Sequence, residues 1–88
     1  MGFLDKLSGL FGGSRQYSVR TKSGSEYVVE QIENNWFLTK DEKKCQIGMV
    51  GGKLAAQAKI TDFEGYVIHY TEDGKRKSTT QVVEVRAL

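Results

Sequence analysis

Hydrophobic positions at the start of the chain follow a helical period. Within residues 1–11 the large apolar side chains are Phe3, Leu4, Leu7, Leu10 and Phe11. Their spacing places them along one stripe of a helix, with most polar residues off that stripe. The pattern predicts a short amphipathic helix and a flexible Gly12-Gly13-Ser14 tether, which together make up a first segment over residues 1–14.

The period changes to two from residue 15 onward, which indicates β-strands. Runs of β-branched and aromatic residues alternate with turns, and these runs begin near residues 16, 26, 36, 45, 53, 66 and 76. Starts that recur every 8–13 residues are typical of an antiparallel meander or a small barrel. We expect a mainly β fold over residues 15–88, a single antiparallel domain of about five to seven strands that forms a meander or a barrel-like sheet.

Turn residues set the expected strand ends. Asn34-Asn35 suits a tight turn because Asn tolerates a positive φ, and Gly51-Gly52 suits a two-residue hairpin turn. Asp73-Gly74 is a stronger hairpin signal. The β-branched run that follows predicts one last strand over residues 76–86.

Residues 53–60 carry two conflicting signals. Leu54, Ala56, Ala58 and Ile60 alternate as in a strand, whereas Ala, Leu, Gln and Lys are strong helix formers. We favour a strand, because the preceding glycine pair suits a hairpin and both neighbouring segments look β. A short helix over residues 53–59 is the alternative.

Composition narrows the function classes. The chain has 88 residues and a net charge of +2, too balanced for the strong polyanion attraction of a histone-like protein. One cysteine, Cys45, excludes an internal disulfide, and with one histidine, His69, it leaves too few ligands for a structural zinc site. No run approaches the roughly 20 apolar residues that span a bilayer, and the first residues make a poor secretory signal. We expect a cytoplasmic protein without a metal or another cofactor.

Catalytic chemistry has little support in the sequence. Cys45 and His69 could form a nucleophile–base pair, but no third residue can be nominated to support them. Paired carboxylates fall in turn-like segments among lysines, where their charge is solvated, and not across a cleft. The run 48–53 resembles a glycine-rich phosphate loop, but it lacks the spacer and the Ser or Thr after Lys53. We expect no catalytic residues and no enzyme.

Single-stranded nucleic acid binding is the runner-up function. Small barrels bind single strands by stacking bases on aromatic rings within a positive groove. The residues that could supply such a surface are Trp36, Lys53, Lys59, Tyr66, Tyr70, Lys75, Arg76 and Lys77. The competing interpretation is that the aromatic residues fill the core and the lysines protect exposed strand edges.

The N-terminal stripe carries the main functional hypothesis. It could dock on its own domain as a lid, lie in a membrane interface, or insert into a partner or a second copy of the chain. In composition this segment resembles the short amphipathic peptides of the antimicrobial class, which implies surface activity. We expect a non-enzymatic interaction module that associates with a protein, itself included, or peripherally with the inner leaflet of a membrane. No small-molecule substrate is indicated.

Overall fold

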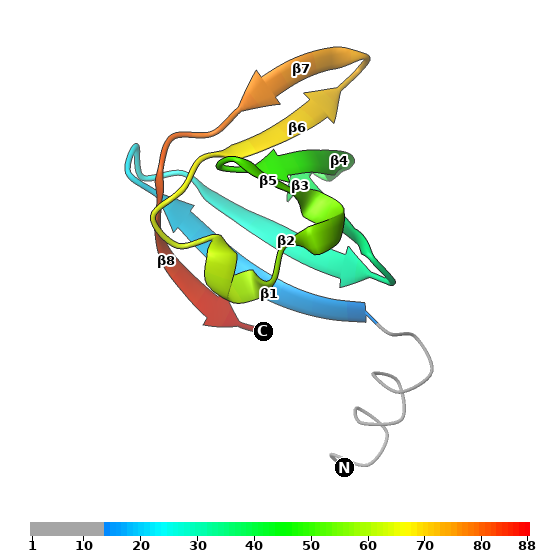
Figure 1. The fold of residues 1–88 in the computed structure, drawn as a ribbon. Coiled ribbons are helices and arrows are strands. Elements are labelled where there is room, and N and C mark those ends of the chain that lie inside the picture. Colours follow the sequence, from blue (N-terminus) through cyan, green and yellow to red (C-terminus); the bar gives the residue numbers. More distant parts are fainter. Residues whose placement is uncertain (1–13) are drawn as a thin grey trace.

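The computed structural model describes residues 14–88 of the chain. The predicted N-terminal helix, with Phe3, Leu4, Leu7, Leu10 and Phe11, lies outside the described residues. The described residues form an antiparallel sheet and two short 3₁₀ helices, η1 and η2 (Figure 1). The strands are β1 (Ser14–Thr21), β2 (Glu26–Ile32), β3 (Asn35–Lys40), β4 (Lys43–Val50), β5 (Lys53–Leu54), β6 (Ile68–Glu72), β7 (Lys75–Ser78) and β8 (Val82–Ala87). The 3₁₀ helices are η1 (Ala55–Gln57) and η2 (Ile60–Asp62).

The strand order confirms a mainly β, antiparallel fold. The described residues form eight strands where five to seven were predicted, and their sheet is open, so the barrel-like form of the prediction is corrected. The order across the sheet is β7-β6-β4-β3-β2-β1-β8, and β5 pairs with the end of β4. The first four strands form a meander, and β8 returns to pair with β1. The sheet is open, but the amide of Val82 donates to the Tyr66 carbonyl at 2.9 Å and the amide of Gly65 to the Val82 carbonyl at 2.8 Å. These bonds tie the start of β8 to the segment before β6.

The inner face of the curved sheet carries the core. Alternate residues of β1–β4, β6 and β8 point inward, as the period of two requires. The buried apolar residues are Val19, Val29, Trp36, Leu38, Cys45, Ile47, Val50, Ala55, Ala58, Phe63, Ile68, Tyr70 and Val82. Trp36 is central, because its ring packs at 4.8 Å from that of Phe63 and its Nε1–H donates to the Ala58 carbonyl at 3.0 Å.

The predicted strand over residues 53–60 is wrong beyond its first two residues. Only Lys53 and Leu54 pair, with Val50 and Met49, and the chain then turns into η1. Ala55 and Ala58 are both buried at a spacing of three, the period of a 3₁₀ turn. The Trp36 indole binds the carbonyl at the end of that turn. The alternative prediction, a short helix over residues 53–59, is closer to the structure, although the observed helix is a 3₁₀ turn over Ala55–Gln57.

The predicted last strand over residues 76–86 is divided in two. β7 ends at Ser78 and β8 begins at Val82. The cause is Thr79, whose buried hydroxyl accepts from the Ile68 amide at 3.1 Å and donates to the Thr80 carbonyl at 2.7 Å. These bonds hold the chain while it leaves β6 and crosses to pair with β1.

The turns largely follow their residue types. The hairpins at Gly51-Gly52 and Asp73-Gly74 are confirmed by the pairs Val50–Lys53 and Glu72–Lys75. The turn expected at Asn34-Asn35 lies one residue earlier, because Ile32 pairs with Asn35. Glu33 there has a φ of 57°. Among the described residues, no helix has the length and apolarity needed to cross a membrane.

Candidate functional site

The outer face of β4, β6 and β7 contains an open groove of about 620 Å³, which we call the β4–β6–β7 groove. Its lining residues are Gly48, Met49, Gly51, His69, Tyr70, Thr71, Arg76, Lys77 and Ser78. Met49, His69 and Ser78 stand opposite one another across the three strands, and Thr71 stands opposite Arg76. The β6–β7 hairpin that forms one side extends beyond the rest of the sheet (Figure 1).

A glycine within β4 opens the floor of the groove. Gly48 lies where the pairing of β4 with β6 shifts register, between Ile47 and Met49. A Cβ atom placed on Gly48 meets no heavy atom within 4 Å, and its φ lies outside the left-handed region. Glycine within a strand costs roughly 0.5–1 kcal/mol relative to alanine. Neither packing nor backbone conformation within the described residues requires this glycine.

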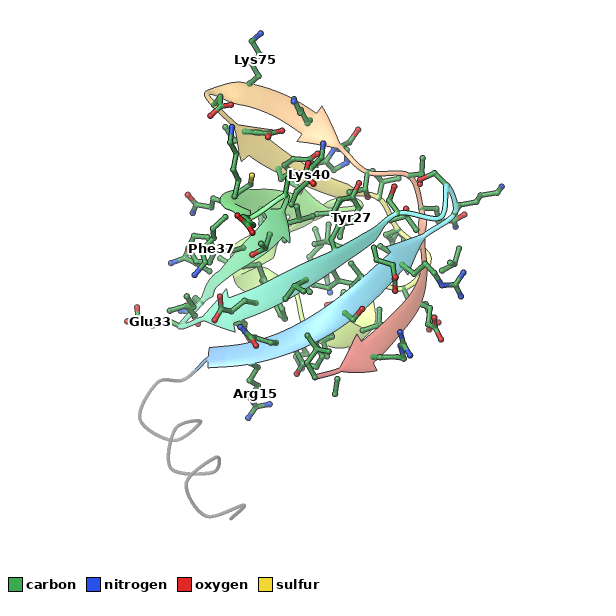
Figure 2. All side chains as sticks on the ribbon, turned by 180° about the vertical axis from the view of Figure 1, so that it is seen from behind. Arg15, Tyr27, Glu33, Phe37, Lys40 and Lys75 are labelled. Carbon is green, nitrogen blue, oxygen red and sulfur yellow. The ribbon has the colours of Figure 1, made fainter. Side chains whose placement is uncertain are left out.

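The groove has a positive lining. None of its residues is acidic. Arg76 forms no ion pair with any carboxylate of residues 14–88, whereas Lys77 binds Glu72 at 2.8 Å. That hydrogen bond raises the pKa of Lys77 and lowers the pKa of Glu72. Lys75, at the tip of the hairpin, points away from the body (Figure 2).

Exposed apolar side chains border the groove. Leu54 in β5 pairs with Met49 in β4, and they are 54% and 36% exposed. Tyr66 is 55% exposed and lies against Gly51, where a Cβ atom would come within 2.7 Å of the tyrosine Cδ1. The site therefore combines an apolar border with unpaired hydrogen-bond donors.

The structure separates the residues of the predicted nucleic-acid surface. The Trp36 and Tyr70 side chains are in the core, 1% and 5% exposed, so neither ring offers a face to a base; their selection as stacking residues is corrected. Both stand on inward positions of their strands, where a large ring fills the core of a small domain.

The remaining residues of that set are on the surface. Lys53 binds Asp62 at 3.3 Å, and Lys77 is held by Glu72. The exposed members are Lys53, Lys59, Tyr66, Lys75, Arg76 and Lys77. Of the eight, Tyr70, Arg76 and Lys77 line the one groove.

Cys45 and His69 lie on opposite faces of the sheet. Cys45 is buried, and desolvation raises the pKa of its thiol. His69 is exposed on the outer face and lines the groove. The described residues contain no group of three or more His, Cys, Asp or Glu side chains that could hold a metal ion.

Three of the carboxylates that stand in pairs along the sequence, Asp62, Glu72 and Asp73, have structural partners. Asp62 accepts from the Lys59 amide at 2.8 Å at the start of η2, and this bond lowers the pKa of Asp62. Asp73 binds Lys43 at 3.0 Å and raises the pKa of that lysine. These interactions join surface segments and do not form an acid–base pair across a cleft.

The groove was not found from the sequence. From the sequence, Gly48 and Met49 are expected in a strand and belong to an incomplete phosphate-loop pattern, and His69 is considered only as a base. A glycine inside an apolar strand is the signal that could have indicated it, because such a glycine marks a bulge or a close approach. The comparisons with protein-family models, curated proteins and solved structures find no match to this chain. The function is therefore inferred from the residues of this chain alone.

Proposed function

We propose that this protein is a non-enzymatic interaction module whose N-terminal apolar stripe attaches the β body to another protein, a second copy included, or to a membrane surface. The stripe consists of Phe3, Leu4, Leu7, Leu10 and Phe11. The observation that supports the proposal is that residues of the β body, from Val19 to Val82, form a hydrophobic core of their own. Every buried side-chain nitrogen and oxygen of the described residues has a hydrogen-bond partner.

The free energies expected for burial and ordering of the stripe favour a reversible attachment. Complete burial of five such side chains would contribute on the order of 10 kcal/mol, but an interface buries only part of them. Ordering the eleven-residue segment opposes this by roughly 1 kcal/mol or more per residue. A single copy therefore binds weakly, and several copies on one assembly bind firmly through avidity.

The competing role for the stripe is that of a lid on its own body. A second hollow, of about 310 Å³, lies beside β1, β8 and η2. Its apolar lining includes Tyr17, Ile60 and Val85, which also pack against the core. If the stripe is a lid, disrupting it lowers the stability of the body. If it serves the proposed attachment, disrupting it leaves that stability unchanged.

The test replaces Leu7 and Phe11 with Asp in the full chain. The matched control is Ser8→Asp with Gly9→Asp, which adds the same charge off the stripe. We expect the stripe variant to keep its thermal unfolding midpoint, Tm, and to lose self-association in sedimentation or cosedimentation with anionic vesicles. Retention of association by the stripe variant contradicts the proposal. A large fall in Tm for that variant alone supports the lid.

Single-stranded nucleic acid binding remains the second candidate. The positive groove with Arg76 and Lys77 favours it, but the burial of Trp36 and Tyr70 removes two of its stacking rings. Its signature is an affinity for an oligonucleotide that falls linearly with salt on a double logarithmic scale. Attachment through the apolar stripe persists as salt rises.

A further inference from the structure

The β4–β6–β7 groove has the properties of a binding site on the body itself, separate from the N-terminal stripe. Its floor exists because position 48 has no side chain, and no described neighbour occupies the place that a side chain would take. Since glycine weakens a strand, the open floor comes at a cost in stability that the fold does not require. A glycine within a strand marks a bulge, and Gly48 lies at such a shift in register, or a place where another molecule approaches the sheet.

The polar groups of the groove point to an anionic ligand. Arg76 and His69 are diagonal neighbours across β7 and β6, on the same outer face. Diagonal neighbours lie roughly 7–8 Å apart, so one carboxylate between them can accept from both side chains. The hydroxyls of Thr71 and Ser78 line the same wall. No carboxylate lines the groove to compete for these donors.

The apolar border points to a ligand that is more than an anion. Met49 lines the groove beside the open floor, with Leu54 next to it. An apolar side chain lying over Gly48 would contact Met49, and Tyr66 lies at the end marked by Gly51. Alternating acidic and apolar side chains are what an extended peptide offers to such a surface.

We propose that the β4–β6–β7 groove binds an extended acidic peptide segment of a partner protein. A carboxylate of the segment is held by Arg76 and His69, and a neighbouring apolar side chain lies over Gly48 against Met49. Charge complementarity selects this occupant. The exposed cations Lys75 and Arg76 on the edge strand β7 disfavour edge-to-edge pairing with β7 of a second copy, because like charges opposite one another are destabilising.

In the test, a short peptide of alternating glutamate and leucine is added to the full chain, and binding is followed through the amide chemical shifts of the protein. The same peptide with glutamine in place of glutamate is the ligand control. We expect the glutamate peptide to shift the amides of Gly48, Met49, His69 and Arg76, and the glutamine peptide to bind roughly tenfold more weakly or not at all.

Two groove variants examine the site independently. Gly48→Val fills the floor, where an added Cβ atom meets no neighbour within 4 Å and φ lies outside the left-handed region. Its control is Ser18→Val in β1, outside the groove. Arg76→Gln removes the guanidinium, and its control is Lys22→Gln, an exposed residue outside the groove. We expect each groove variant to weaken binding roughly tenfold and each control to leave it unchanged. Thermal unfolding of each variant verifies that it folds.

Four outcomes would overturn the proposal. The first is no shift of groove amides, and the second is equal binding of both peptides. The third is unchanged peptide binding by Arg76→Gln. This outcome can be measured even if Gly48→Val fails to fold. The fourth is displacement of the peptide by a single-stranded oligonucleotide of higher affinity, which would assign the groove to nucleic acid instead. Replacement of Leu7 and Phe11 with Asp should leave peptide binding intact, so failure of the attachment proposal is distinguishable from failure of this one.

Discussion

The two faces of the sheet use the same strands for different purposes. In β6, Ile68 and Tyr70 point inward and are buried, while His69 and Thr71 point outward into the groove. The inner face is apolar apart from polar groups that are all bonded. The outer face carries surface ion pairs, such as Lys44 with Glu30 at 3.1 Å, and the positive groove. Alternation along a strand thus separates residues that stabilise the fold from residues free to contact another molecule.

The largest effect is expected from a cavity on the inner face. Phe63→Ala removes a completely buried ring that packs on Trp36, and should lower the free energy of unfolding by about 3–5 kcal/mol. His69→Ala, on the outer face, should change it by less than about 0.5 kcal/mol. Denaturant unfolding measures both. A comparable loss for the two variants would contradict the division between the faces.

Gly51→Ala should be next in size, because both its conformation and its contacts require glycine. Its φ is +59°, and the new Cβ atom would lie 2.7 Å from Cδ1 of Tyr66. We expect a loss of about 1–3 kcal/mol in the free energy of unfolding. Gly48→Ala, which has neither constraint, is the matched control and should be close to neutral or stabilising.

A double-mutant cycle separates the two causes at Gly51. If the contact with Tyr66 contributes, Gly51→Ala should cost less in a Tyr66→Ala background. An identical cost in both backgrounds would leave the positive φ as the whole cause.

The pH dependence of stability tests the burial of Cys45 on the inner face. Burial raises its thiol pKa above the ordinary value of 9.0, so the folded state keeps the proton while the unfolded state loses it. This contribution is complete below pH 9.0 and declines as the pH rises above that value. The fall in Tm from neutral to alkaline pH should therefore be smaller in Cys45→Ala. Rapid alkylation of the native thiol near neutral pH would contradict this and would indicate a reactive thiolate at Cys45.

The smallest effect is expected at a surface carboxylate. The Lys59 amide, with Lys53 nearby, lowers the pKa of Asp62, so its stabilising effect is present above the ordinary value of 3.8 and lost as the pH falls through the folded value. Asp62→Asn should have a lower Tm than the native chain at neutral pH. The two Tm values should converge in acid. A difference that stays constant with pH would assign the effect to packing.

The sequence predicted most of the β fold because its signals were local. The alternation of Tyr17, Val19 and Thr21, and the Asp73-Gly74 turn, each depend on residues a few positions apart. The errors at residues 53–60 and 76–86 arose from distant partners. Trp36 fixes the first segment through the Ala58 carbonyl, and Thr79 ends β7 through the Ile68 amide.

The candidate site was harder to predict because it is a property of register. The register shift between β4 and β6 places Met49 opposite His69 and leaves Gly48 without a partner in the β4–β6 pairing, and no local pattern in the sequence states that shift. The stacking role given to Trp36 and Tyr70 failed for a related reason. Composition showed that aromatic residues were present, but only strand alternation decides which of them face the core.

The central claim, that the described body folds without the apolar stripe and leaves it free for attachment, is tested most directly by removing the stripe. A chain that begins at Ser14 retains all of β1. Its thermal unfolding, far-ultraviolet spectrum and sedimentation should be compared with those of the full chain. We expect the shortened chain to show a cooperative β-type transition with a similar Tm and to lose association. Loss of cooperative unfolding, or unchanged association, would contradict it.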